Sequence, residues 1–279
     1  MLVNLNDVLI PARRGKYAVG LFNTVNLELA RGVMEAAEEL DSPVIIGTAE
    51  VLLPYGPIED LANLLIPMAE RASVPVVVHL DHGLKEETCR QALDLGFSSI
   101  MYDCSTMEYE ANIEHVKRMA ETAHACGASI EAELGHVGDN GGEDPSLFYT
   151  DSAQARDFIE RTGADALAIA VGTAHGAYKL PPKLDFNRIA EIAENIPTPL
   201  VLHGGSGLSD SDFRTAVERG ISKVNIFTDI NQACARAAAL GYREGMGLTD
   251  IILPEIEAVK QSVMEKMRLF GSVGRGSER

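Results

Sequence analysis

The sequence has little of several features that mark particular classes of protein. None of its four cysteines belongs to a C-x-x-C pair, so free thiols in a reducing cytoplasm are a simpler interpretation than disulfides. No stretch approaches about 18 apolar residues, which excludes a membrane-spanning helix. Residues 1–17 lack the basic-then-apolar pattern of a secretory signal. We therefore expect a cytoplasmic protein.

Positive charge is also scarce. The chain has 24 Lys and Arg against 41 Asp and Glu, and its formal net charge is −17. Such a field repels polyanions, which argues against nucleic acid or a membrane surface as a partner. A small anionic substrate remains compatible with the sequence, provided that its site supplies local cations or backbone N–H groups.

Eight short apolar segments recur along the chain, and amphipathic stretches with helical spacing separate them. The segments lie at 17–23, 43–49, 75–82, 98–104, 128–135, 166–173, 199–206 and 223–229. Most are continuously apolar, as is typical of parallel strands covered on both faces. The pattern favours an α/β fold with a single (β/α)8 (TIM) barrel over residues 1–279, and a doubly wound open sheet is the alternative.

Three segments lie outside the eight repeats. A helix over residues 4–14 is expected to cap the bottom of the barrel. An extra amphipathic helix is expected over 254–269, and it would pack on the barrel or on another subunit. The tail 272–279 has nothing to bury and is expected to be loose.

Polar residues gather where the predicted strands end, which is where barrels of this kind carry their chemistry. These residues are Asn23, Asp81, His82, Asp103, Glu131, Glu133, His175, His203, Asn225 and Thr228. Three of them are histidines from three different strand ends. Imidazole suits zinc, and three ligands with one open position are typical of a catalytic zinc site. His79, three residues before His82, is expected to be a buried structural histidine.

The segment PVVVHLDHG (75–83) contains a geometric conflict. Asp81 and His82 are adjacent, so strand alternation sends them to opposite faces. Both are nevertheless expected at the same opening. The sequence therefore predicts that the strand twists or ends at Asp81, and that Gly83 permits the turn.

Two glycine-rich segments complete the predicted rim. In HGGSG (203–207) the glycines allow close backbone approach to an anion, Ser206 adds a hydroxyl, and the following helix adds its dipole. Asn225 to Thr228 would complete this cradle, and Lys179 would add a full charge. Residues 135–146 contain four glycines followed by acidic residues, which favours a hinged lid over a plain surface loop.

Together these motifs resemble the class II, zinc-dependent aldolases, which include the fructose-1,6-bisphosphate and tagatose-1,6-bisphosphate aldolases. The resemblance rests on HLDHG (79–83), EAELG (131–135), GTAHGAYK (172–179), HGGSG and KVNIFTD (223–229), and it extends over about residues 2–272. It implies a (β/α)8 barrel, a homodimer or homotetramer, that reversibly joins dihydroxyacetone phosphate to an aldehyde. It also implies one catalytic Zn²⁺ per subunit.

The resemblance assigns roles to individual residues. It makes His82, His175 and His203 the zinc ligands and Asp81 the acid/base on the hydroxyl at the bond being cleaved. Asp103 and Glu133 match polar positions that can also touch an alternative metal position.

Further roles concern the phosphate and the lid. The positions that match the dihydroxyacetone phosphate site are Gly176, Lys179, Gly204, Ser206, Asn225 and Thr228, to which we add Asn23 and Gly205 at the same rim. A monovalent cation, Na⁺ or K⁺, often accompanies that phosphate in the family. Glu143 best matches the lid carboxylate that exchanges the proton on carbon, with Asp144 and Asp139 as alternatives.

The chain departs from the family pattern at two places. Phe227 stands where many bisphosphate aldolases have Asp or Ala, and Thr249 or a neighbour stands where they have the arginine that grips the second phosphate. Arg243 and Arg268 are the candidate substitutes. The sequence thus supports cleavage of a bisphosphate, or alternatively of a ketose 1-phosphate whose aldehyde half lacks the second phosphate. A non-catalytic sugar-phosphate-binding barrel and a metal hydrolase are further alternatives.

Overall fold

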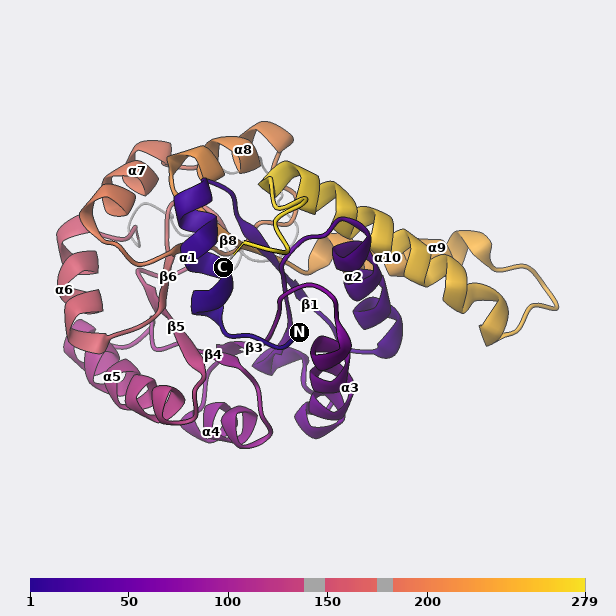
Figure 1. Cartoon of the computed structure of the whole chain (residues 1–279), viewed down its shortest axis with the longest axis horizontal. Helices are drawn as coiled ribbons and strands as arrows, with labels where there is room; N and C mark the ends of the chain where they lie inside the picture. The colour runs from indigo at the N-terminus through magenta and orange to yellow at the C-terminus, as the bar shows by residue number, and fades with distance from the viewer. Residues whose placement is uncertain (138–148, 175–182, 279) are drawn as a thin grey trace.

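In the computed structural model, which describes residues 1–137, 149–174 and 183–278, eight parallel strands close into one barrel (Figure 1). Each strand pairs with the next in chain order, and β8 pairs back onto β1. The strands are β1 (Val19–Asn23), β2 (Val44–Ala49), β3 (Val76–Gly83), β4 (Ser99–Tyr102), β5 (Ser129–Leu134), β6 (Ala166–Ile169), β7 (Leu200–Leu202) and β8 (Ile221–Ile226). The predicted (β/α)8 barrel is confirmed, and the open-sheet alternative is wrong.

Helices surround the barrel and alternate with its strands (Figure 1). They are α1 (Leu5–Gly15), α2 (Leu27–Glu39), the 3-10 turn η1 (Glu50–Leu52), α3 (Ile58–Arg71), α4 (Glu86–Asp94), α5 (Tyr109–Ala125), α6 (Ser152–Thr162), α7 (Phe186–Asn195), α8 (Asp210–Arg219), α9 (Thr228–Gly241) and α10 (Leu248–Phe270). In the part of the chain that the structure describes, none of these helices is long and apolar enough to cross a membrane.

The predicted capping helix is α1. Asn4 starts it by accepting the backbone N–H of Asn6, and Asp7 accepts the N–H of Asn4 in return. The helix buries Val8 and Leu9 against inward-facing strand residues such as Val77. It thereby covers the amino-terminal end of the barrel, so chemistry is left to the opposite, carboxyl end of the strands.

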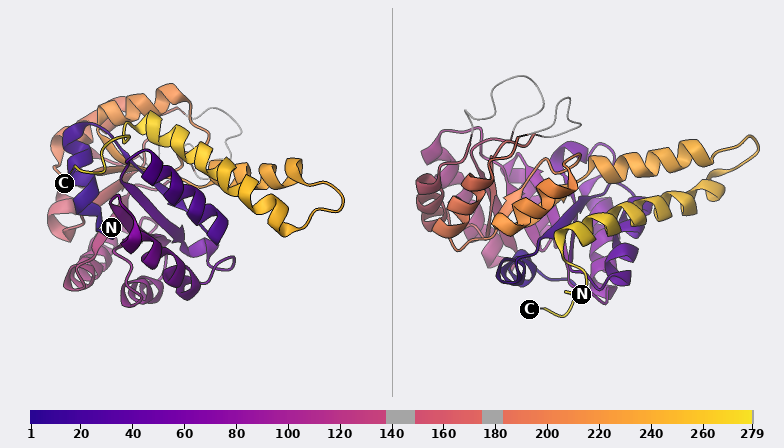
Figure 2. Two further views of the ribbon diagram at one scale, coloured as in Figure 1. Left: turned by 45° about the vertical axis from the view of Figure 1, so that its right-hand side comes forward. Right: turned by 90° about the horizontal axis from the view of Figure 1, so that it is seen from above.

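The last two helices form an antiparallel pair that projects beyond the barrel (Figure 2). The base of α10 packs on α2, where a Cβ added to Gly32 would lie 2.6 Å from Val259 Cγ1. This helix starts at Leu248 rather than at the predicted residue 254, because the Asp250 carboxylate accepts the N–H of Gly247 and opens the helix earlier. The eighth strand also begins and ends earlier than predicted: it spans Ile221–Ile226 instead of 223–229, and residues from Thr228 onward belong to α9.

Residues 272–278 lie against the bottom of the barrel. Ser272 is fully buried and bonds to Ser42, 2.8 Å between the hydroxyl oxygens. Farther along, the backbone N–H groups of Gly274 and Gly276 donate to the carbonyls of Leu40 and Asp41. This segment therefore has polar partners although it contributes little apolar surface.

Candidate active site

A pocket opens at the carboxyl end of the strands. Its lining comprises Asn23, Ala49, Val51, Leu52, Asp81, His82, Leu84, Asp103, His136, Val137, Gly204, Gly205, Ser206, Asn225, Ile226, Phe227 and Thr228. These residues come from the carboxyl ends of β1, β2, β3 and β8, from η1, from the loops after β3, β4, β5, β7 and β8, and from the start of α9. The pocket therefore brings together residues that are up to about 200 positions apart in the sequence, as barrel closure requires.

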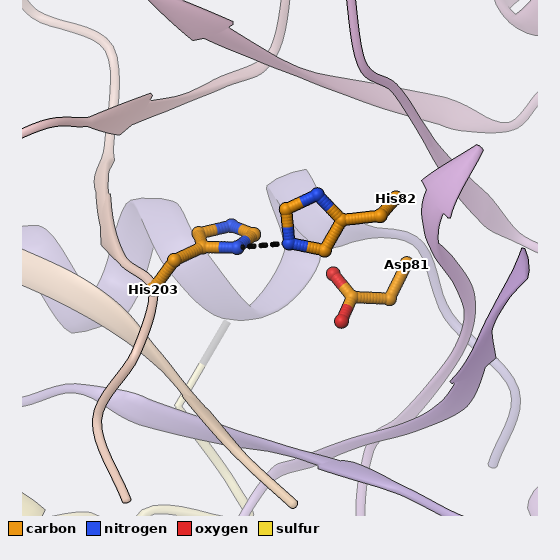
Figure 3. Close-up of side chains that lie close together, drawn as sticks. All are labelled: Asp81, His82 and His203. Carbon is orange, nitrogen blue, oxygen red and sulfur yellow. Dashed lines mark hydrogen bonds between the residues drawn. The ribbon is translucent and has the colours of Figure 1, made fainter. Parts of the chain in front are cut away.

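Asp81 and His82 line this pocket, and the fully buried His203 lies beside His82 just beneath the lining (Figure 3). The distance from His203 Nδ1 to His82 Nε2 is 2.7 Å. One ligand atom from each of the three residues lies within 4.8 Å of the others, a spacing that a metal ion can bridge. The structure thus brings together these three predicted residues from β3 and the end of β7.

The β3 backbone resolves the predicted conflict between Asp81 and His82. Val77 belongs to the inner core of the barrel, whereas Val78 and Leu80 belong to the core beneath the helices. By alternation Asp81 points inward and His82 points outward. His82, however, has a left-handed backbone with φ 42, and the pairing of β3 with β4 shifts register between Leu80 and Gly83. This irregularity turns the His82 ring to the opening.

Gly83 has a different role from the predicted one. The positive φ belongs to His82, and β3 continues through Gly83. A Cβ added to Gly83 would lie 2.5 Å from Cys89 Sγ and 2.7 Å from the Met101 carbonyl oxygen. The glycine is therefore required for close packing of the strand after the turn.

A carboxylate orients each of the two histidines. His82 Nδ1 lies 2.8 Å from Asp103 Oδ2, and His203 Nε2 lies 2.8 Å from Glu131 Oε1. Because an ionised carboxylate only accepts, these contacts place protons on His82 Nδ1 and His203 Nε2. The opposite ring nitrogens, His82 Nε2 and His203 Nδ1, face one another across a hydrogen bond. Both can bind a metal once the proton between them leaves, and a carboxylate behind each ring is the usual arrangement around metal-binding histidines.

Burial and nearby charge shape the pKa values at this centre. Burial alone would raise the pKa of Asp81, but His82, His203 and Lys223 reverse the effect and hold it well below its usual range. Burial alone would lower the pKa of His82, but Asp81 and Asp103 raise it to about 9. Asp81 is therefore ionised at neutral pH, and without a metal His82 retains a proton there.

Two amides hold the Asp81 carboxylate from both sides. Asn23 Nδ2 donates to Asp81 Oδ2 at 2.7 Å, and Asn225 Nδ2 donates to Asp81 Oδ1 at 2.9 Å. All three side chains are at least nine-tenths buried. Asn23 and Asn225, predicted from the sequence as substrate-binding residues, therefore contact the predicted base directly.

A second group that could hold a metal consists of His82, Asp103 and Glu133. Glu133 is fully buried, and its Oε1 accepts the backbone N–H of Val137. Within the described residues its Oε2 has no hydrogen-bond partner. A buried carboxylate oxygen in that situation is suited to a cation. The alternative metal position at Asp103 and Glu133 remains a prediction.

The glycine-rich loop after β7 lies against the start of α9. A Cβ on Gly204 would lie 2.3 Å from the Ala174 carbonyl oxygen, and one on Gly205 would lie 2.8 Å from Val224 Cγ1. Ser206 Oγ accepts the N–H of Phe227 at 3.3 Å. The helix that begins at this pocket is α9, with Thr228 as its first residue, rather than the helix after Gly207 named in the sequence prediction.

Glu131 was predicted at a strand end without a role in the site, and Lys223 was missed. Both have fully buried side chains, and Lys223 Nζ lies 2.7 Å from Glu131 Oε2. His79 is also fully buried, its Nδ1 lies 2.7 Å from Ser99 Oγ, and burial lowers its pKa to about 3. Its position agrees with the predicted structural role.

Several predicted residues lie outside the described part of the chain. They are His175, Gly176, Lys179, Glu143 and the alternatives Asp139 and Asp144. Their assignments as third zinc ligand, phosphate-binding residues and lid carboxylate remain predictions.

These observations define a closed α/β barrel with a candidate metal site at the carboxyl end of its strands. Residues 3–275 match the sequence model of one family, described as fructose-bisphosphate aldolase class-II. The chain therefore belongs to the class II fructose-bisphosphate aldolase family, whose members are carbon–carbon lyases that act on sugar phosphates.

Individual relatives agree with this placement. A fructose-bisphosphate aldolase of Geobacillus stearothermophilus is 40% identical over 287 residues, which cover 99% of each chain. The protein YdjI of Escherichia coli K12 is 40% identical over 262 residues, or 93% of this chain and 94% of YdjI. The crystal structure of the YdjI aldolase matches with a TM-score of 0.90 at 37% identity, covering 99% of this chain and 100% of that one.

Proposed function

We propose that this protein is a zinc-dependent aldolase. It would reversibly cleave a ketose phosphate, of the fructose-1,6-bisphosphate or tagatose-1,6-bisphosphate type, to dihydroxyacetone phosphate and an aldehyde. The observation that carries the proposal is the meeting of Asp81, His82 and His203 beside the pocket at the carboxyl end of the strands, in a barrel of the class II aldolase family.

The donor set fits zinc. His82 Nε2 and His203 Nδ1 are imidazole nitrogens whose rings are oriented by Asp103 and Glu131, and imidazole is a preferred zinc ligand. His175 is the proposed third ligand. When bound, zinc would supply Lewis-acid polarisation of the substrate ketone oxygen.

Asp81 is the proposed acid/base for the hydroxyl at the bond that breaks. Its carboxylate is ionised at neutral pH and lies beside the proposed metal ligands, so it can accept the hydroxyl proton as the bond is cleaved. The two amides of Asn23 and Asn225 hold it in place for this step. Glu143 is the proposed group that returns a proton to carbon.

The loop after β7 and the start of α9 are the proposed site for the phosphate of dihydroxyacetone phosphate. Backbone N–H groups at a glycine-rich loop and a helix N-terminus bind anions without needing a net positive protein. This would involve Gly204, Gly205, Ser206 and Thr228, joined by Gly176 and Lys179. A monovalent cation at this phosphate and a homodimeric or homotetrameric assembly complete the proposal.

A specific observation favours a second substrate class, a ketose 1-phosphate whose aldehyde half carries no phosphate. The described lining of the pocket contains no Lys or Arg, and its mouth carries Val51, Leu84 and Phe227. Val51 and Leu84 are 64% and 50% exposed. Arg243 bonds instead to the carbonyls of Leu240 and Tyr242 at the far end of α9. A second phosphate would thus face apolar side chains and the carboxylates of Asp81 and Asp103.

A panel of ketose mono- and bisphosphates, assayed for dihydroxyacetone phosphate, tests both candidates. Zinc-loaded protein should cleave at least one of them, and removal of the metal by a chelator should abolish the activity. Failure to release dihydroxyacetone phosphate from any ketose phosphate would reject the aldolase proposal. Equal or better turnover of fructose-1,6-bisphosphate than of matched 1-phosphates would reject the second candidate alone.

A further inference from the structure

Lys223 is a charged residue in the interior of the barrel. It lies on β8 and is fully buried, the one lysine in that state among residues 1–137, 149–174 and 183–278. A buried ammonium is costly unless charged or polar groups surround it. Lys223 Nζ has two such neighbours, with Glu131 Oε2 at 2.7 Å and Asn225 Oδ1 at 2.8 Å. Lys223 therefore joins two side chains that each contact a proposed catalytic or metal-binding residue.

The first connection leads to His203. Lys223 Nζ lies 2.7 Å from Glu131 Oε2, and these two fully buried side chains balance each other's charge. An ionised Glu131 can only accept a hydrogen bond, so its Oε1 keeps the proton on His203 Nε2, 2.8 Å away. The lone pair of His203 is then on Nδ1, which faces His82.

The second connection leads to Asp81. An ammonium only donates, so Lys223 requires the carbonyl oxygen of the Asn225 amide on its side. The amide nitrogen then points the other way and donates to Asp81 Oδ1 at 2.9 Å. If the amide were reversed, its oxygen would face the Asp81 carboxylate and repel it.

We propose that Lys223 is a positioning residue that sets two features of the site at once: the tautomer of His203, through Glu131, and the orientation of Asp81, through Asn225. Lys223 reaches His203 and Asp81 only through Glu131 and Asn225, and it is not part of the pocket lining. This inference rests on the proposed function, because it assumes that His203 binds the metal and that Asp81 is the base.

Lys223→Met tests the proposal, because methionine keeps an unbranched chain of similar length and removes the donor. We expect zinc affinity to fall about 10- to 100-fold, the usual effect of losing a residue that orients a metal ligand. We expect the visible spectrum of the Co²⁺-substituted protein to change, and kcat to fall more than KM rises. Lys266→Met is the matched control: Lys266 pairs with Asp229 at 2.7 Å, and neither residue lines the pocket.

A second variant keeps the test decisive if Lys223→Met fails to fold. The double variant Lys223→Met/Glu131→Gln removes the buried Glu131 charge that the single variant leaves without its ammonium partner, so it should regain thermal stability. Its zinc affinity should nevertheless stay low, because the neutral amide introduced by Glu131→Gln can turn either its oxygen or its nitrogen toward His203. The proposal would be overturned if the folded single or double variant had the same zinc affinity, cobalt spectrum and kcat as the wild-type protein.

The zinc and cobalt titrations separate this inference from the proposed function, since neither uses a sugar phosphate. If the wild-type protein binds zinc but cleaves no ketose phosphate, the aldolase proposal is wrong, whereas weaker zinc binding by Lys223→Met still supports the link through Glu131. If the wild-type protein binds neither zinc nor cobalt in these titrations, the proposed metal site is wrong and the inference fails with it.

Discussion

Asp81 and His82 are consecutive in the chain and yet line the same pocket, although a regular strand would point them to opposite faces. The left-handed backbone of His82 (φ 42) makes this possible, in a region that non-glycine residues rarely adopt. Strained conformations of this kind persist where the surrounding structure fixes them, often at functional sites. Here the strain places a proposed metal ligand directly beside a proposed base.

The packing of Gly83 should support this turn. Gly83→Ala would force a Cβ to within 2.5 Å of Cys89 Sγ, so we expect a loss of about 1–3 kcal/mol in the free energy of unfolding and weaker zinc binding. Denaturant unfolding and a zinc titration measure the two effects. Gly241→Ala is the control, because an added Cβ there meets nothing within 4 Å. An unchanged Gly83→Ala protein would show that the turn at His82 does not depend on this packing.

Asp81→Asn should separate proton transfer from metal binding. Asparagine has nearly the same shape, so we expect the zinc content to remain at the wild-type level while kcat falls by about 10²–10⁴, the usual contribution of a general base. Metal analysis and the dihydroxyacetone phosphate assay give the two readouts. His203→Ala should show the converse primary defect, loss of the metal itself. Substantial kcat in Asp81→Asn would assign the proton transfer to another group.

The fold was predictable because it rests on a repeated local signal. Continuous apolar strands alternating with amphipathic helices indicate a parallel sheet with both faces covered, and each of the eight predicted segments overlaps a barrel strand. The errors are at boundaries: α10 begins at Leu248 because of a cap at Asp250, and the last strand ends at Ile226 because α9 begins at Thr228. Such boundaries depend on single side-chain contacts, which periodicity does not reveal.

The site residues at the rim of the barrel were predictable from the sequence, whereas the buried residues that support them were less so. Asp81, His82 and His203 stand at strand ends. Lys223 stands within β8, and Glu131, which the sequence analysis grouped with the strand ends, stands within β5, so the two meet only when the barrel closes. A signal for both was nevertheless present. A charged residue inside a strand covered on both faces must have a partner, and Lys223 shares its face of β8 with Asn225 two residues later. The left-handed backbone of His82 had no such signal.

Zinc binding should depend on pH, because metal and proton compete for His82. Its pKa in the metal-free protein is raised to about 9, so below that pH a proton must leave when zinc binds. The apparent affinity should therefore rise by about tenfold per pH unit up to about pH 9 for release of one proton. The same raised pKa stabilises the metal-free fold below about pH 6.5, and this contribution is lost as the pH rises through about 9.

Zinc titrations between pH 6 and 9 check this dependence. Asp103→Asn is the informative variant, since Asp103 is one of the groups that raise the pKa of His82, and its replacement should move the plateau to lower pH. Affinity that is constant over the whole range would contradict the competition.

The apolar mouth of the pocket should set the charge of the accepted aldehyde. Leu84 is half exposed and lines the mouth, so Leu84→Arg would place a cation where a second phosphate would approach. We expect kcat/KM for fructose-1,6-bisphosphate to rise roughly fivefold relative to fructose 1-phosphate, because an exposed ion pair contributes up to about 1 kcal/mol. The effect should fade at high salt. Leu84→Gln, which adds polarity without charge, is the matched control, and an equal change in both variants would show that charge at the mouth does not determine the choice of substrate.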